Sequence, residues 1–67
     1  MEDVIGDTAG EIWRFLNAEG PQNLSAITRN IRKPNATIYM AIGWLARENK
    51  LQFNKTNRGI TISVKPE

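Results

Sequence analysis

Basic side chains are the residues whose type and spacing could do chemistry here, and that chemistry is the binding of phosphate. Five of them fall in two short stretches: Arg29, Arg32, Lys33, Lys55 and Arg58. Lysine and arginine supply most contacts to nucleic-acid backbones. Residues 1–20 carry five acidic and one basic side chain, whereas residues 21–67 carry two acidic and eight basic ones. This division predicts affinity for phosphate, although a small domain also needs surface charge for solubility.

Catalytic chemistry has little support in the composition. The chain contains no histidine and no cysteine, so it lacks the commonest general base and a thiolate for catalysis or metal binding. Ser25 and Ser63 therefore have no histidine to activate them, and no glycine-rich phosphate loop follows a strand. We expect no enzyme activity, no cofactor and no small-molecule ligand.

Acidic residues recur every four positions near the start, at Asp3, Asp7 and Glu11. This spacing predicts a ridge along one helix, where a divalent cation would find no converging ligands. We expect a solvated face, with Glu11 near Arg14, and no metal site.

The elements that position these residues begin with a helix over residues 3–19. Its apolar residues recur at intervals of three and four, at Ile5, Ala9, Ile12, Trp13 and Leu16. Asp3 is the predicted N-cap, and Gly20-Pro21 is a strong stop signal. Gly6 and Gly10 share one side, where another backbone could come close.

Two further helices are predicted around a tight turn. Ser25 is the expected N-cap of the second helix, which buries Ile27 and Ile31 and ends before Pro34. The third helix runs from Asn35 to Glu48, with Asn49 as a left-handed C-cap. Its buried stripe consists of Ile38, Ala41, Ile42 and Leu45.

Residues 51–55 and 60–65 instead alternate between apolar and polar side chains, which is typical of strands. Leu51 and Phe53 share one face, and Ile60, Ile62 and Val64 are expected to point inward. The link "TNRG" predicts a hairpin. The predicted fold is α+β, mainly α: one winged helix-turn-helix domain over residues 1–67, with three helices followed by a two-stranded β-hairpin wing.

Three stretches carry a resemblance to known proteins: "IGDTAGEIWRFLNAEG", "LSAI" and "AIGWLARENKLQF". They resemble a small family of stand-alone bacterial and archaeal winged-helix domains of unknown function, within the winged helix-turn-helix superfamily. The Gly-Trp-Leu-Ala-Arg-Glu run is typical of the narrow family, and the rest is general to winged helices. The resemblance covers nearly the whole chain and implies a nucleic-acid role, with Lys55 and Arg58 on the wing.

A recognition helix would present its N-terminal residues to base edges. Asn35, Thr37 and Tyr39 lie near that end of the third helix. Asparagine can pair with adenine, and threonine can contact a thymine methyl group or a phosphate. Asn35 could instead be used as the helix cap.

The outward side of the third helix also suits a protein partner. Small and apolar residues there would let a second helix approach closely. The candidate interface is Ala36, Met40, Gly43, Trp44 and Arg47. Alternatively, Trp44 and Tyr39 wrap onto the first helix or the wing.

Two hypotheses follow. The first is a DNA-binding domain that holds double-stranded DNA mainly through phosphate contacts, as a homodimer and possible transcriptional regulator. The second is a protein-interaction or dimerisation module that does not bind DNA. No apolar run approaches the roughly 20 residues of a membrane span, and the start does not resemble a signal peptide. We therefore expect a cytoplasmic protein.

Overall fold

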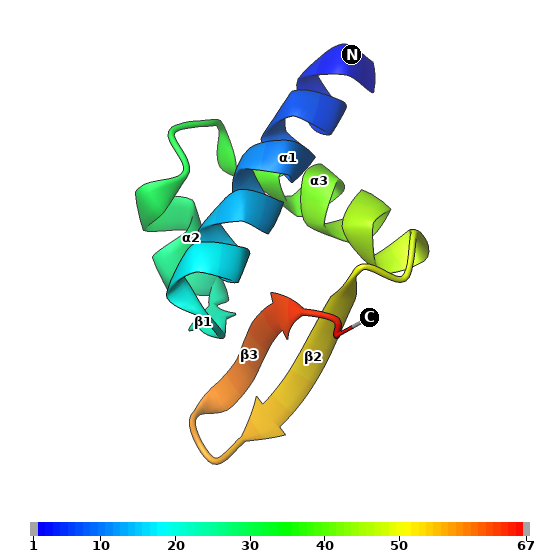
Figure 1. Ribbon diagram of the computed structural model, residues 1–67. Coiled ribbons are helices and arrows are strands. Elements are labelled where there is room, and N and C mark those ends of the chain that lie inside the picture. Colours follow the sequence, from blue (N-terminus) through cyan, green and yellow to red (C-terminus); the bar gives the residue numbers. More distant parts are fainter. Residues whose placement is uncertain (1, 67) are drawn as a thin grey trace.

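The computed structural model describes residues 2–66, which form three helices and a three-stranded antiparallel sheet (Figure 1). In chain order the elements are α1 (Glu2–Glu19), β1 (Gln22–Asn23), α2 (Leu24–Asn30), α3 (Asn35–Arg47), β2 (Leu51–Thr56) and β3 (Gly59–Val64). The β2–β3 hairpin, called the wing below, extends away from the helices (Figure 1). Three helices followed by a wing confirm the predicted fold class.

Helix α1 ends where the sequence predicted and begins one residue earlier. Gly20 has φ +80°, and its N–H donates to the carbonyl of Leu16 at 2.9 Å, which closes the last turn. Because α1 begins at Glu2, Asp3 lies within the first turn, so its prediction as the N-cap is wrong. Its carboxylate still lies at the positive end of the helix dipole.

The start of α2 also differs from the prediction. The Oδ1 atom of Asn23 accepts a hydrogen bond from the backbone N–H of Ala26 at 2.8 Å, so Asn23 is the N-cap and Ser25 is not. The reason lies in the sheet. Gln22 and Asn23 pair with β3 as the short strand β1, and α2 begins as soon as this pairing ends. The predicted two-stranded sheet thus gains a third strand.

Helix α3 ends in a tight motif at Asn49, whose φ is +61°. The N–H of Asn49 donates to the carbonyl of Ala46, and that of Lys50 donates to Leu45, both at 3.0 Å. These two bonds form a Schellman motif, and they confirm the left-handed C-cap. The motif turns the chain directly into β2 at Leu51.

The strand order is β1-β3-β2, and the register of the wing decides which side chains share a face. Phe53 pairs with Ile62, and Lys55 pairs with Ile60. The largest fully buried side chains come from the three helices: Thr8, Ile12, Leu16, Ile27 and Ile38. Leu51 and Ile62 join them from the sheet.

Ile60 was expected to point into the core, and that expectation is wrong. Its side chain is 55% exposed, whereas Ile62 on the same face is 4% exposed. The alternation of the strand is intact, but the wing extends past the helices, so nothing covers its outer half (Figure 1).

Candidate nucleic-acid interface

The turn between α2 and α3 spans residues 31–34 and leaves the start of α3 open. The N-cap of α3 is Pro34, which makes no side-chain capping bond, and the first helical bond runs from the N–H of Ile38 to the carbonyl of Pro34 at 3.1 Å. Asn35 is therefore the first helical residue and does not cap the helix. Its side chain is exposed at the end of α3 that a recognition helix would present.

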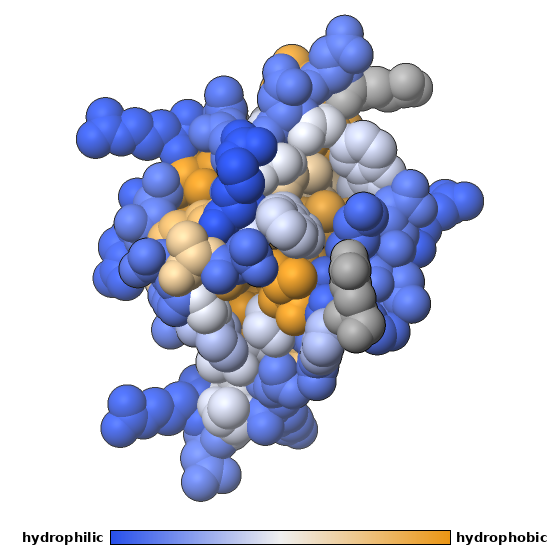
Figure 2. Space-filling model, viewed as in Figure 1, coloured by the Kyte–Doolittle hydropathy of each residue, from blue (hydrophilic) through white to orange (hydrophobic). Residues whose placement is uncertain are grey.

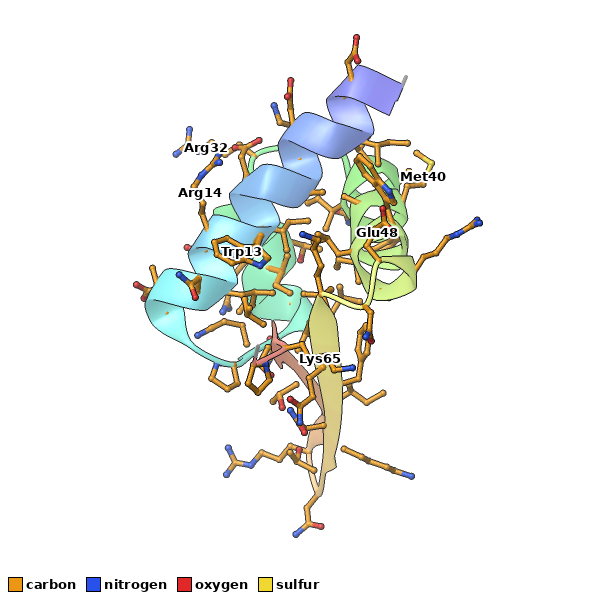
Figure 3. All side chains as sticks on the ribbon, turned by 45° about the vertical axis from the view of Figure 1, so that its right-hand side comes forward. Trp13, Arg14, Arg32, Met40, Glu48 and Lys65 are labelled. Carbon is orange, nitrogen blue, oxygen red and sulfur yellow. The ribbon has the colours of Figure 1, made fainter. Side chains whose placement is uncertain are left out.

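The five predicted phosphate-binding bases are all exposed. Arg29 lies in the last turn of α2, Lys55 lies on β2, and Arg58 lies at the tip of the wing. Lys33 differs, because its Nζ lies 3.6 Å from Oε2 of Glu11 on α1. In Figure 3, Arg32 lies on the opposite side of α1 from Met40. Lys33 is thus held toward α1, and in this view α1 separates Arg32 from Met40 on the outward side of α3.

The outward strip of α3 is formed by residues four or three apart: Ala36, Met40, Gly43 and Arg47, all exposed. A Cβ atom added at Gly43 would meet nothing within 4 Å, so this position faces open space, as the spacing predicted. Before Arg47, the strip offers no side-chain hydrogen-bond donor. It can contact a partner closely but has no group to recognise a base edge.

Trp44 turns away from this strip and packs on α1. A Cβ atom added at Gly6 would lie 3.1 Å from Cζ3 and 3.3 Å from Cη2 of Trp44. Packing of Trp44 on the first helix is one of the two arrangements that the sequence left open; the other placed Trp44 in a partner interface. A shallow apolar cleft runs along this side, and it is lined by Gly6, Ala9, Gly10, Trp13, Trp44 and Leu45, among others. Gly6 thus admits a side chain of α3, where the sequence suggested a backbone.

Figure 2, viewed with α1 in front, shows hydrophobic residues between a rim of long hydrophilic side chains. On α1, Asp3, Asp7 and Glu19 are exposed, and Glu11 pairs with Lys33 and not with Arg14 as expected. Within residues 2–66, no three acidic side chains come together as ligands for a metal ion. No helix in that range has the length and apolar character needed to cross a bilayer.

Sequence reasoning missed a second apolar surface, on the other flank of α3. Tyr39 leans toward the wing and lines a groove with Phe53 and Ile60, both of which are half exposed. We call it the α3–wing groove; its lining consists of Leu24, Tyr39, Ile42, Phe53, Ile60 and Ile62. The alternation in the strands identified the correct face but carried no information on how far α2 and α3 extend over it.

Comparison with known proteins now fixes the family. A family model described as a winged helix-turn-helix domain (DUF2582) matches residues 1–64. The chain belongs to this family. It is 44% identical over 71 aligned residues to the uncharacterized protein MJ1608 of Methanocaldococcus jannaschii, covering 97% of this chain and all of that protein.

A solved structure has the same fold as this winged helix-turn-helix domain. Protein BT2368 from Bacteroides thetaiotaomicron, determined by solution NMR, is 30% identical and superimposes with a TM-score of 0.81. The match covers 94% of this chain and 77% of that protein. These relatives show the fold, and the function must be argued from the surface residues.

Proposed function

We propose that this winged helix-turn-helix domain binds double-stranded DNA, with most of the affinity from contacts to phosphates. The observation that carries the proposal is the charge of the chain after α1. Residues 20–66 contain eight basic side chains and one acidic one, Glu48. The segments on either side of it, residues 20–47 and 49–66, contain no acidic side chain. Arg29 lies on α2, Lys55 and Arg58 lie on the wing, and all three side chains are exposed. No carboxylate in those segments would repel a phosphate.

The same geometry favours weak dependence on sequence. Asn35 and Thr37 lie in the first turn of α3, where a recognition helix enters the major groove. The neighbouring residues of the outward strip, Ala36, Met40 and Gly43, have no side-chain groups that hydrogen-bond to base edges. Base recognition would then rest on two side chains, and phosphate contacts would supply the rest of the affinity. Such a domain could act as a transcriptional regulator only with a modest preference for its site.

The test is binding of a dye-labelled mixed-sequence duplex, followed by fluorescence anisotropy at several salt concentrations. The dissociation constant should rise steeply with salt, because binding releases counterions. Two double variants, Arg29→Ala/Arg32→Ala and Lys55→Ala/Arg58→Ala, test the predicted contacts. In each, the slope of log Kd against log salt concentration should become less steep by about 1 for each phosphate that a removed side chain neutralised.

A matched control removes two charges outside the predicted phosphate-binding set. One is Arg14 on α1, and the other is Lys65 after β3, which is one of the eight basic residues but donates from its Nζ to Oδ1 of Asn49 at 2.7 Å. Arg14→Ala/Lys65→Ala changes the net charge by the same amount, and both side chains border clefts that Trp13 also lines. We expect this control to bind nearly as the wild type does. Absence of binding at micromolar protein in low salt, or equal reductions in affinity in all three double variants, would contradict the proposal.

A second candidate function, self-association, is favoured by the outward strip of α3. Met40 is a half-exposed apolar side chain between Ala36 and the open position at Gly43, and Arg47 continues the strip; Trp44, predicted as part of this interface, packs on α1 instead. Small residues would let two α3 helices pack closely, and methionine adapts to irregular surfaces.

Sedimentation equilibrium tests this candidate. If the strip forms a homodimer, the wild type should be dimeric and Met40→Glu should be monomeric, because a carboxylate would be buried against apolar side chains. A wild type that stays monomeric at high concentration would rule out the homodimer.

A further inference from the structure

Four large apolar side chains are exposed together along the α3–wing groove. Its outer walls are Leu24, Tyr39, Phe53 and Ile60, which are 40%, 49%, 48% and 55% exposed. The buried side chains of Ile42 and Ile62 form its floor. Exposed apolar patches that gather in one place mark contact sites more often than scattered residues do.

The groove exists because the wing extends beyond the helices. A compact protein of 7.6 kDa should expose about 4,300 Å² of surface, whereas this chain exposes 4875 Å². The surplus, about 600 Å², approaches the share that one partner buries in a standard interface. The surplus belongs to the whole chain; the extended wing contributes to it and leaves the groove between α3 and the wing open to solvent.

The charge around the groove is of one sign. Lys55 pairs directly with Ile60 across the wing and so projects from the same face as the groove. Arg58 lies two residues before Ile60, at the tip of the wing. The segments that form the walls, from β1 to α3 and from β2 to β3, contain no acidic residue. An occupant that complements this surface has apolar side chains flanked by carboxylates.

We propose that the α3–wing groove binds an acidic amphipathic helix of another protein. This inference goes beyond DNA binding and does not depend on it. A helix lying between α3 and the wing would cover all four exposed walls with one apolar stripe. A strand added to the open edge of β2 would extend the sheet but leave Leu24 and Tyr39, which lie on helices, uncovered.

Other occupants fit the groove less well. A second copy docked symmetrically would bring the same basic rim against itself, because a two-fold interface pairs each patch with its own image. A nucleic acid could stack bases on the two aromatic walls, Tyr39 and Phe53, but the other lining residues are aliphatic, and the Tyr39 hydroxyl is the polar side-chain group among them. Bases bind best to flat aromatic faces and to hydrogen-bonding groups. With four aliphatic residues beside two aromatic ones, the lining matches leucine and phenylalanine side chains better than a run of bases.

The experiment uses the full chain and a small panel of dye-labelled peptides. Each peptide has leucine or phenylalanine in an i, i+3, i+4, i+7 pattern with glutamates between them. Two control peptides are used: one keeps the composition in a scrambled order, and one keeps the apolar pattern but replaces every glutamate with lysine. We expect saturable binding of the patterned acidic peptides by fluorescence anisotropy, and at least tenfold weaker binding of both controls.

Variants locate the binding site. Phe53→Thr and Ile60→Thr keep good strand formers in the wing while removing apolar walls, and each should weaken peptide binding at least tenfold. Val4→Thr removes an equally exposed apolar side chain from α1 and should leave peptide binding unchanged. Circular dichroism checks that all three variants are folded. The affinity for the DNA duplex should be the same in all three, which separates this proposal from the proposed function.

Four results would overturn the inference. The first is that no patterned peptide binds at millimolar concentration, and the second is that the lysine control binds equally well. The third is self-association of the chain that Ile60→Thr abolishes. The fourth is tight binding of labelled oligothymidylate that Ile60→Thr abolishes. The last two would assign the groove to a second copy or to a single-stranded nucleic acid.

Discussion

At the scale of single residues, the two glycines near Trp44 have different roles. Gly43 precedes Trp44 in the chain but faces open space. Gly6, far away in sequence, is the residue on which the indole of Trp44 rests. The absence of a side chain at Gly6 lets α1 and α3 pack across this contact. The folded domain gains no such packing from Gly43. The free-energy cost of a glycine inside α3 therefore needs another explanation.

Replacing Gly43 with alanine should stabilise the domain. The added methyl group meets no atom within 4 Å, and alanine is favoured over glycine inside a helix by about 1 kcal/mol. We expect Gly43→Ala to raise the free energy of unfolding by about 0.5–1 kcal/mol, measured by urea denaturation followed by circular dichroism. Gly6→Ala is the matched comparison, and it should gain less, because its methyl group forces Trp44 to shift. Equal gains at both sites would contradict this account of Trp44.

The larger variant Gly43→Leu extends the comparison to binding. It should leave the core intact and yet block whatever docks on the outward strip of α3. Duplex binding and sedimentation, measured on the same protein, show which of the two associations is blocked.

At the scale of elements, the start of α2 illustrates how a local signal and a distant contact combine. Asn23 and Ser25 are both good capping residues. Pairing of β1 with β3 keeps Gln22 and Asn23 extended, and this selects Asn23 as the cap. The prediction from sequence placed the cap two residues too late because β1 was not foreseen.

This difference can be measured. Asn23→Ala removes the 2.8 Å bond to the N–H of Ala26 and should lower the free energy of unfolding by about 1 kcal/mol. Ser25→Ala changes a residue inside the first turn of α2 and should lower it by much less. Thermal and urea unfolding of both variants provide the comparison. A larger decrease for Ser25→Ala would show that the helix begins where the sequence alone suggested.

Other boundaries were predictable because their causes are local. Gly20-Pro21 ends α1, and Asn49 ends α3, through backbone conformations that these residue types adopt easily. Strand β1 was not predictable, since two residues show no periodicity and their partners lie about 40 positions away. The exposed half of the wing was missed for a similar reason. Alternation tells which side chains share a face, but only the packed helices determine where the core stops.

At the scale of the whole molecule, the residues that stabilise the fold and those available for contacts occupy different regions. The core cluster lies between the three helices and the inner half of the wing. Basic side chains and exposed apolar walls lie on the outer half of the wing and beside α3. The chain thus carries apolar side chains at Phe53 and Ile60 that contribute little to its own packing.

This separation predicts opposite outcomes for two isoleucines. Domains of this length have a free energy of unfolding of about 3–10 kcal/mol. Ile38 is fully buried, and Ile38→Ala should cost about 2–5 kcal/mol, enough to unfold much of the population. Ile60→Thr should change the free energy of unfolding by less than about 1 kcal/mol, because the side chain is already more than half in water.

Urea titrations followed by circular dichroism measure the free energy of unfolding of both variants and test this prediction. A large decrease in stability for Ile60→Thr would mean that the outer half of the wing belongs to the cooperative core. In that case the apolar residues of the α3–wing groove would need no partner to explain them. A small decrease would mean that these apolar side chains do not stabilise the isolated chain. That is the result expected for residues that become buried only when another molecule binds.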